Sequence, residues 1–410
     1  MNKKKIIVLS DHALSTSGVG VQTRHLINGL IKKGKWTFRQ LGAAIKHSDY
    51  NIIKVNEDFI IKPIDGFGNK EILRRILITE KPDALLIFTD PRFFNWLFEI
   101  EDEIHQVCPI FWWHVWDNRP TPDFNNWMYE ATDAINCHSY LTYEMCSENF
   151  PEKTRFIPHA IPKNIFFEMS EKEKLDFKVK LLGENKKDFF TVFWINRNAR
   201  RKRPGDLLYS WKLFIDKTDR KDAVLLIHSD PNDKEGVNMP EIIRKFNLEN
   251  NVILSTDKVD FSEINVLYNI SDATINISFA EGFGLSTLES MQTGTPILAV
   301  TTGGLTRQVI DYRDGSENGV AIKPKVTSLV GSQSVPYIFE DYAEPNEIAE
   351  AIFKLYNMDD EKRKNLSEKV KQYAQDAFSY EKTIDLWDES LEETIGNWKE
   401  KRKRFCIEEV

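Results

Sequence analysis

The sequence predicts an α/β protein with two doubly wound domains, each a parallel sheet covered by helices on both faces. Three observations support this fold class. The chain of 410 residues exceeds one ordinary core and fits two domains of about 150 to 200 residues each. Short apolar runs alternate with amphipathic helical patterns from end to end. These runs are continuously apolar, as strands buried on both faces require.

The first half of the chain has the pattern of successive strand, helix and strand units. The apolar residues of 20–33 recur at helical spacing, and Gly34 follows where glycine commonly ends a helix. We place the first domain at residues 1–170. The strands expected in this half include residues 5–10, 84–89 and 109–113.

The second half repeats the pattern after a charged surface helix and linker at residues 171–188. We place the second domain at residues 189–375. Residues 325–345 lack clear periodicity and are expected to form an inserted loop, and residues 376–410 are expected to form a final helix. The elements expected here are strands at 189–195, 223–229, 273–278 and 296–300, and helices at 262–268, 285–292, 346–356 and 381–398.

Composition excludes several classes of protein. The net charge of −8 argues against a general nucleic-acid binder. No apolar run approaches the roughly 20 residues that a membrane-spanning helix needs. The basic tail, residues 399–404, would suit peripheral contact with acidic lipid, and a solvated helix end is the alternative.

The four cysteines show neither paired metal-ligand spacing nor a disulfide framework. The apolar run at residues 6–9 is too short for a signal-peptide core. We therefore expect a cytoplasmic protein, and the sequence does not indicate its oligomeric state. The cysteines are Cys108, Cys137, Cys146 and Cys406.

The most informative segment is a glycine-rich turn between a strand and a helix, which reads A-E-G-F-G-L-S-T-L-E from Ala280. Backbone amides at a helix start are unpaired and partly positive, and glycines let them approach a phosphate closely. Glu281 and Glu289 would be repelled by a phosphate, so we expect them to accept hydrogen bonds from sugar or ribose hydroxyls. The alternative is an ordinary strand-to-helix turn with a glutamate favoured by the helix dipole.

A basic segment, N-R-N-A-R-R-K-R-P from Asn196, directly follows an expected strand. Five cations within seven positions repel one another unless an anion compensates them. Arginine can clamp phosphate oxygens through two hydrogen bonds, and lysine acts as a point charge. We expect a phosphate site here, and a solvated basic loop is the alternative.

Two segments of the first half are weaker candidates. Gly18 and Gly20 follow the first strand and would hold a loop close to a ligand, or they form a plain connection. His114 ends an expected strand among tryptophans. It would either hydrogen-bond a sugar hydroxyl or be a buried structural histidine.

Together these segments resemble the retaining glycosyltransferases of family four, which have the GT-B fold of two Rossmann-like domains facing a central cleft. The strongest element is the E-x7-E pattern of Glu281 and Glu289 around G-F-G. The second is Arg197 with Lys202, after a strand. The usual glycine before the arginine is Asn196 here, and the usual asparagine-glycine of the proline turn is His159-Ala160.

The resemblance implies a role for each candidate residue. Arg197 and Lys202 would hold the donor diphosphate, and Glu281 would bind hydroxyls of the donor sugar. Glu289 would bind the ribose, and His114 would approach the sugar from the first domain. Backbone contacts to the donor would come from Gly18, Gly20, Gly282, Phe283, Gly284 and Leu285.

The function that follows is retaining transfer of a sugar from a nucleotide-diphosphate sugar to a glycan, lipid-linked or other hydroxyl acceptor. The donor would be UDP-, GDP- or ADP-linked, and no cofactor would stay bound. The chain contains no Asp-x-Asp pair, so we expect transfer without a metal. The alternative is a degenerate relative that binds a nucleotide sugar or glycan without catalysis. An NAD-dependent oxidoreductase is disfavoured, because Thr23 stands where its glycine fingerprint needs a third glycine.

Overall fold

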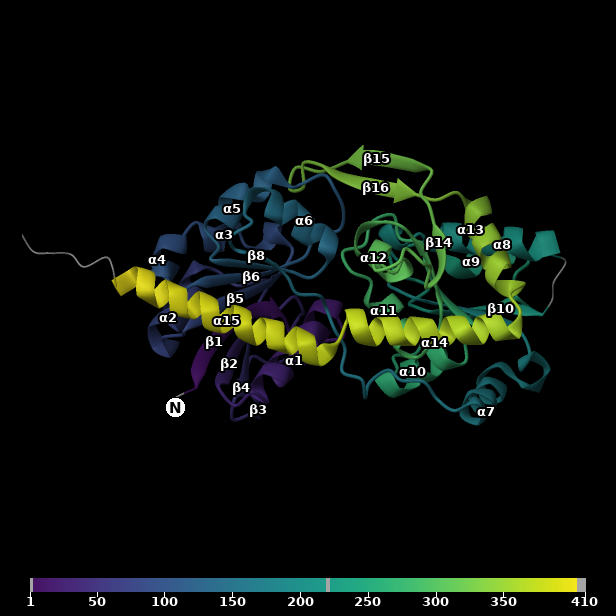
Figure 1. Cartoon of the computed structure of the whole chain (residues 1–410), viewed down its shortest axis with the longest axis horizontal. Helices are drawn as coiled ribbons and strands as arrows, with labels where there is room; N and C mark the ends of the chain where they lie inside the picture. The colour runs from purple at the N-terminus through teal and green to yellow at the C-terminus, as the bar shows by residue number, and fades with distance from the viewer. Residues whose placement is uncertain (1–2, 219–221, 404–410) are drawn as a thin grey trace, which may run out of the picture. The chain divides into compact units, whose positions relative to one another are not determined.

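The computed structural model describes residues 3–218 and 222–403, and the chain divides into two compact units (Figure 1). The first unit consists of Met1–Ala160, Gly331–Ile338 and Tyr380–Val410. The second consists of Ile161–Val330 and Phe339–Ser379.

The first unit is built on an eight-stranded sheet in the order β3-β4-β2-β1-β5-β6-β7-β8. Neighbouring strands pair in parallel, except that β3 pairs antiparallel with β4 at one edge. The strands are β1 (Lys4–Asp11), β2 (Trp36–Ala43), β3 (Ile53–Asn56), β4 (Phe59–Pro63), β5 (Ala84–Thr89), β6 (Ile110–His114), β7 (Ala134–Cys137) and β8 (Thr154–Phe156).

Helices cover both faces of this sheet. Successive residues of β1 point to opposite faces, so Ile6 packs with α1 and α15, whereas Ile7 belongs to the core that α2, α3, α4 and α5 cover. The helices are α1 (Gly18–Ile31), α2 (Lys70–Glu80), α3 (Asn95–Phe98), α4 (Glu101–His105), α5 (Asn126–Glu130), α6 (Tyr140–Asn149) and α15 (Tyr380–Lys403), with short 3₁₀ turns η1 (Pro91–Phe93) and η2 (Asp123–Asn125).

The second unit has a six-stranded parallel sheet in the order β11-β10-β9-β12-β13-β14. Its strands are β9 (Phe190–Ile195), β10 (Ala223–His228), β11 (Val252–Ser255), β12 (Ala273–Asn276), β13 (Ile297–Val300) and β14 (Gly319–Ile322).

Two helical layers cover this second sheet. Side chains of α8, α9 and α13 fill the core on one face, and side chains of α10, α11, α12 and α14 fill the core on the other. The bounds are α7 (Glu171–Leu182), α8 (Pro204–Thr218), α9 (Met239–Lys245), α10 (Phe261–Asn269), α11 (Leu285–Gln292), α12 (Thr306–Val309), α13 (Pro345–Tyr356) and α14 (Asp360–Ala377), with turns η3 (Glu184–Lys186), η4 (Arg200–Lys202) and η5 (Gly303–Leu305).

The expectation of an inserted loop at residues 325–345 is wrong. This segment contains β15 (Val326–Val330) and β16 (Ile338–Tyr342), which form a two-stranded sheet. Most of β15 is exposed, including Val326 and Leu329. Because no face of β15 is fully buried, its sequence carries no alternation from which a strand could be predicted. The helix α14 was also missed, because its 18 residues bury only Val370, Tyr373 and Ala374.

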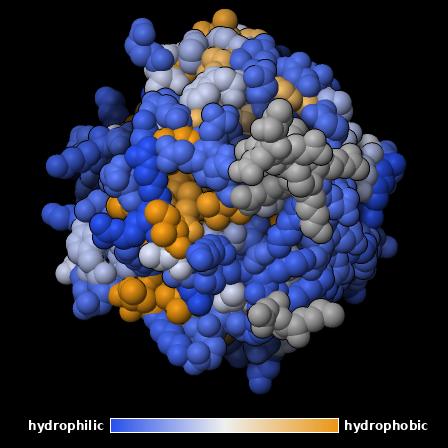
Figure 2. Space-filling view, turned by 90° about the vertical axis from the view of Figure 1, so that its left-hand side faces the viewer, coloured by the Kyte–Doolittle hydropathy of each residue, from blue (hydrophilic) through white to orange (hydrophobic). Residues whose placement is uncertain are grey.

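The surface is mostly hydrophilic in the view of Figure 2, with hydrophobic side chains gathered in a patch left of its centre. Among residues 3–218 and 222–403, no helix is long and apolar enough to cross a bilayer. Nor do three His, Cys, Asp or Glu side chains of these residues gather in a way that could hold a metal ion. Of the predicted features, Cys406 and the end of the basic tail lie outside the described residues.

Candidate functional site

The carboxyl ends of β9 and β12 form the topological switch point of the second unit's sheet. These strands pair directly, β10 and β11 follow on one side, and β13 and β14 follow on the other. Ligands of open α/β sheets bind outside the carboxyl ends of strands at such a point. The loops that leave it are residues 196–203 and 277–284. The topology therefore brings together the basic segment and the glycine-rich segment, 79 residues apart at Lys202 and Glu281.

Glu281 lies at the junction of these two loops. Lys202 forms an ion pair with its Oε2 atom, and Nη1 of Arg201 lies 3.4 Å from the same oxygen. The hydroxyl of Ser278 donates to this oxygen at 3.3 Å. Burial alone would raise the pKa of Glu281, but the two cations and Ser278 together lower this pKa to about 2. The carboxylate is therefore ionised at neutral pH.

Arg197 lies on the same basic loop but has different partners. Its Nε donates to Oδ2 of Asp233 at 2.7 Å, and its Nη1 lies 3.2 Å from the carboxylate of Glu235. The Arg197 side chain is 60% exposed. The buried carboxamide of Asn198 bonds the backbone of Val237 in both directions, at 2.8 and 3.1 Å, and holds the loop against that segment. Arg197 therefore pairs with Asp233 and Glu235, whereas Lys202 of the same loop pairs with Glu281.

The other three arginines of the basic segment have different partners. Arg200 makes a bidentate ion pair with Glu340 of β16, at 3.0 and 3.1 Å. Arg203 donates to the backbone carbonyl of Ala343 at 2.9 Å. Both side chains thus anchor the segment around β16. Arg201 instead donates to the carbonyl of Ala280 at 2.6 Å, and so joins the group around Glu281.

The glycine-rich loop is shaped so that its amides lead into α11. Gly284 has a φ of 92°, which favours glycine, and it is the N-cap residue of α11. Because glycine has no side chain to cap the helix, the first amides of α11 are available to an anion. The carbonyls of the loop are held by the carboxamide of Gln308, which donates to Phe283 at 2.6 Å and to Gly284 at 3.1 Å. Leu285 begins the helix.

A second close approach fixes the other side of this loop. The amide of Gly304 donates to the carbonyl of Glu281 at 2.8 Å. A Cβ atom at position 304 would lie 2.2 Å from the carbonyl oxygen of Gly282. Glycine is therefore required at 304 if the loop is to keep this conformation.

Glu289 lies one turn into α11 and is half-buried. The hydroxyl of Tyr268 donates to its Oε2 at 2.7 Å. Burial raises the pKa of Glu289 to about 7, and the bond from Tyr268 offsets part of that rise. The two glutamates of the E-x7-E pattern thus differ in charge, since Glu281 is fully ionised and Glu289 titrates near neutrality.

In the first unit, Gly18 and Gly20 lie in the first turn of α1. The side chain of Ser17 caps this helix by accepting from the amide of Gly20 at 3.0 Å, and it donates to Asp11 at 2.7 Å. A Cβ atom at position 20 would lie 2.5 Å from the carbonyl oxygen of His12. This packing accounts for Gly20 within the connection itself, and its contact with a donor stays a prediction.

His114 is fully buried at the end of β6. Its Nε2 shares a hydrogen bond of 2.7 Å with the hydroxyl of Tyr129, and the rings of Trp112 and Trp116 lie beside it. These surroundings are those of a structural histidine among aromatics. An approach of His114 to a donor sugar stays a prediction, and it would require neighbouring side chains to move.

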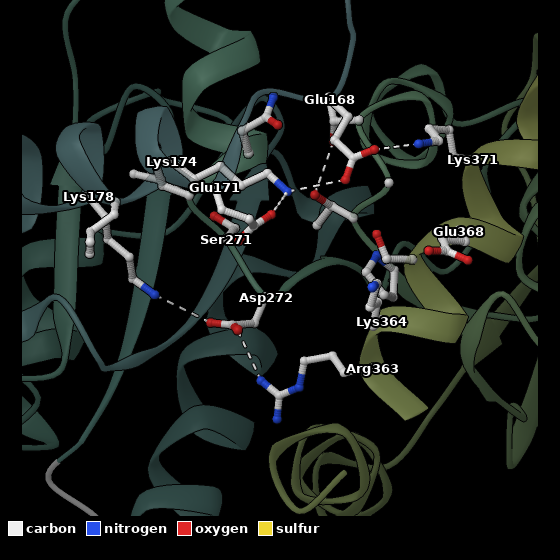
Figure 3. Close-up of a pocket in the computed structure, with 18 of the residues that line it drawn as sticks. Glu168, Glu171, Lys174, Lys178, Ser271, Asp272, Arg363, Lys364, Glu368 and Lys371 are labelled. Atoms are coloured by element: carbon white, nitrogen blue, oxygen red, sulfur yellow. Dashed lines mark hydrogen bonds and ion pairs between the residues drawn. The ribbon is translucent and has the colours of Figure 1, made fainter. Parts of the chain in front are cut away.

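A charged pocket of about 630 Å³ lies at the opposite edge of the second sheet, before the amino ends of β12 and β13 (Figure 3). Its cations pair with its own carboxylates: Lys174 with Glu168 at 3.4 Å, and Arg363 with Asp272 at 3.0 Å. Lys371 also pairs with Glu168. These pairs connect α7 and α14 to the sheet edge, and they leave little net charge to attract a ligand.

One segment of the second unit matches the model of a known protein family. Residues 176–332 match the family model of the glycosyl transferases group 1. This segment resembles the glycosyl transferases group 1, and it covers less than half of the chain. The segment contains both loops of the switch point, and therefore every residue of the group around Glu281.

Curated proteins match part of the sequence. The D-inositol 3-phosphate glycosyltransferase of Pseudarthrobacter chlorophenolicus is 26% identical over 126 residues, 31% of this chain and 30% of that protein. Other curated relatives are matched over 28% and 45% of their lengths, so the matches span less than half of each.

Solved structures resemble the whole fold. Sucrose-phosphate synthase from Thermosynechococcus elongatus has a TM-score of 0.73 at 15% identity, over 96% of this chain and 100% of that chain. Anabaena HepE in complex with UDP and glucose has a TM-score of 0.70 at 15% identity, over 95% and 100%. The prediction of a GT-B fold with two α/β units is confirmed.

The sequence did not reveal several residues of this site. Arg201 was counted among the cations but not distinguished from its neighbours. Asp233, Tyr268 and Gln308 were not predicted as partners of site residues, because each is distant in sequence from the residue that it contacts. Asp233 lies 36 residues from Arg197, Tyr268 lies 21 residues from Glu289 of α11, and Gln308 lies 25 residues from Phe283. The only local signal was Ser278, three residues before Glu281 at the end of an expected strand.

Proposed function

We propose that this protein is a retaining glycosyltransferase that moves a sugar from a nucleotide-diphosphate sugar to a hydroxyl acceptor, such as a glycan or a lipid-linked sugar. The observation that carries the proposal is the ionised Glu281, held by Lys202 and Arg201 beside the uncapped start of α11. A carboxylate, two cations and free helix amides at one switch point match the hydroxyls and the diphosphate of such a donor.

The cations would act on the leaving group. As the bond to the sugar breaks, negative charge grows on the diphosphate, and fixed cations and amides that meet this charge lower the barrier. Arg197 can join them at little cost, because an exposed ion pair such as Arg197–Asp233 contributes at most about 1 kcal/mol. We expect Lys202→Ala to lower the rate by about tenfold to a hundredfold, since a charge-assisted hydrogen bond contributes about 1.5–3 kcal/mol.

The two glutamates would orient the donor. Glu281 accepts hydrogen bonds from hydroxyls of the donor sugar, and Glu289 accepts them from the ribose. The carboxyl of Glu289 must lose its proton to accept two hydroxyls, so donor affinity should rise as pH passes through 7. Because Lys202, Arg201 and Arg197 would face the leaving group in this arrangement, we propose that the reaction needs no divalent metal.

A thermal-shift panel tests this function. UDP, GDP, ADP and their common sugar conjugates are added to the full chain, with and without Mg²⁺. UDP is tried first, because it is the nucleotide bound in the structure of HepE. Arg197→Ala is compared with Arg244→Ala, an exposed arginine of α9 that pairs only with Glu241 among the described contacts. We expect one nucleotide to raise Tm, Arg197→Ala to weaken that rise, and Arg244→Ala and Mg²⁺ to leave it unchanged.

Other outcomes would overturn specific parts of the proposal. A panel without any shift would remove the donor site. A shift that needs Mg²⁺ would overturn metal-independent transfer. Binding without release of the free nucleoside diphosphate, over a range of sugar and lipid-linked acceptors, would favour a binding protein without catalysis.

A further inference from the structure

Donors on one side of the glycine-rich loop bind its backbone carbonyls. Nε2 of Gln308, in α12, donates to the carbonyls of Phe283 and Gly284, at 2.6 and 3.1 Å. The amide of Gly304 donates to the carbonyl of Glu281 at 2.8 Å. Gln308 is fully buried, so the two carbonyls that it binds are held without competition from solvent.

A neighbouring hydroxyl fixes which way the carboxamide of Gln308 faces. The hydroxyl of Thr287 lies 2.6 Å from Oε1 of Gln308 and 2.7 Å from the carbonyl oxygen of Gly284, and it can donate its proton to either oxygen. If the carboxamide were turned by half a rotation, Oε1 would face two carbonyl oxygens, and none of the three could donate. The side chain of Gln308 therefore presents its N–H groups to the loop.

The amides of the loop point away from these donors. In a trans peptide, the C=O group and the N–H group of the next residue point in opposite directions. Since three carbonyls of the loop are held toward residues 304–308, the amides that follow them, those of Gly282, Gly284 and Leu285, face the other way. Within residues 3–218 and 222–403, these three amides donate to no protein acceptor.

This difference between carbonyls and amides indicates a ligand. Gly282 and Gly284 are buried, and more than about nine in ten buried backbone N–H groups in proteins have a partner. A loop held only for packing would satisfy both kinds of group. Backbone N–H groups that converge in a turn form a concave site for an anion. The diphosphate of the proposed donor is such an anion.

We propose that Gln308 is a positioning residue for the donor diphosphate. Because it is fully buried, its side chain acts through the loop and not on the reacting atoms. By holding the carbonyls of Phe283 and Gly284, it aims the amides of Gly284 and Leu285 at the phosphate oxygens. Amides that are aimed in advance need no reorganisation when charge grows on the diphosphate. This inference rests on the proposed function, because it takes the anion to be the donor diphosphate.

Ligand-observed NMR titrations of the full chain test this role. The probes are inorganic pyrophosphate, and UDP, GDP and ADP, each compared with its own nucleoside. Gln308→Met keeps the length of the side chain and removes both of its N–H groups. We expect it to weaken binding of pyrophosphate, and of the nucleoside diphosphate that binds, on the order of tenfold, which is the effect of about one charge-assisted hydrogen bond. The Kd of the nucleoside should be unchanged.

Asn251→Leu is the matched control for loss of a buried carboxamide. Asn251 is 8% exposed, and its Nδ2 donates to the backbone carbonyl of Ala223 at 2.9 Å, at the amino ends of β10 and β11 in the same unit. This variant should lower the free energy of unfolding and bind pyrophosphate as the wild type does. If it weakened pyrophosphate binding as much as Gln308→Met, or if Gln308→Met weakened nucleoside and pyrophosphate equally, Gln308 would have only a structural role.

Hydrogen exchange of the wild type gives a readout that depends on no variant. Pyrophosphate should slow exchange in residues 282–286, because their amides donate to it. If pyrophosphate binds without slowing these amides, or binds Gln308→Met as it binds the wild type, the role of Gln308 is overturned and the donor site stands. If neither pyrophosphate nor any nucleoside diphosphate binds the wild type, the proposed function fails, and the role of Gln308 fails with it.

Discussion

Lys202 and Arg197 each pair with a carboxylate in the second unit, and the two pairs differ in burial. The side chains of Lys202 and Glu281 are 13% and 11% exposed, whereas that of Arg197 is 60% exposed. Removing Lys202 leaves the buried carboxylate of Glu281 with the more distant cation of Arg201, at 3.4 Å, and so weakens the compensation of its charge. We therefore expect Lys202→Met to lower the free energy of unfolding by about 3 kcal/mol. Arg197→Met should lower it by about 1 kcal/mol or less. Urea unfolding at pH 7 measures both, and equal losses would contradict this account.

Glu289 provides a test of charge at a single residue. Its pKa is about 7 in the folded protein and near the ordinary value of 4.5 when unfolded. The folded state therefore binds the proton more tightly, and the free energy of unfolding should fall as pH rises from about 4.5 through 7. Glu289→Gln cannot ionise and should lack this part of the fall. The measurement is urea unfolding at pH 5 and pH 8 for both proteins. An identical pH dependence would show that Glu289 is not destabilised by burial.

At the scale of elements, the basic segment and β16 are joined by side chains. Glu340 is only 8% exposed and accepts both nitrogens of Arg200. We expect Arg200→Ala to speed amide hydrogen exchange in residues 326–342 by about tenfold or more, because a charge-assisted bond to a buried carboxylate is lost. Hydrogen exchange followed by mass spectrometry measures the exchange rate of residues 326–342 in both proteins.

The control for this prediction is Lys325→Ala, at the base of the same sheet. Its ion pair with Glu347 is exposed, since the lysine side chain is 53% exposed. Its removal should leave exchange in residues 326–342 nearly unchanged. If both variants loosened the segment equally, the bidentate pair of Arg200 would not be its anchor.

Elements could be predicted from sequence where burial leaves a local pattern. The strand at residues 84–89 is buried along its whole length, so its apolar run was sufficient to place it. β15 is mostly exposed, so its residues carry no such pattern. Residues of the site could likewise be predicted only where a local sequence pattern marks them. Glu281 and Lys202 could be found because each follows a predictable strand, whereas Tyr268 could not, because its contact with Glu289 depends on how α10 packs against α11.

At the scale of the whole molecule, α15 completes a hydrophobic core of the first unit. α15 contributes Ile384, Trp387, Leu391 and Ile395 to the core that also contains Ile6 of β1. Gly29 of α1 allows this packing, because a Cβ atom there would lie 2.3 Å from Ile384. β1 and α15 therefore belong to one hydrophobic core, and the second unit lies between them in the chain.

This arrangement predicts that one substitution near the end of the chain destabilises the first unit alone. Trp387 is fully buried, and the centroid of its ring lies 5.0 Å from the centroid of the Trp113 ring. Truncation of a buried tryptophan costs about 3–5 kcal/mol. Trp387→Ala should therefore speed hydrogen exchange in β1, β5 and β6 and leave β9 and β12 unchanged. The neighbouring Leu386 is 40% exposed, so Leu386→Ala should leave exchange in both units near that of the wild type. If Trp387→Ala loosened β9 and β12 as much as β1, the two units would unfold together, and the division of the chain into separate cores would not describe its stability.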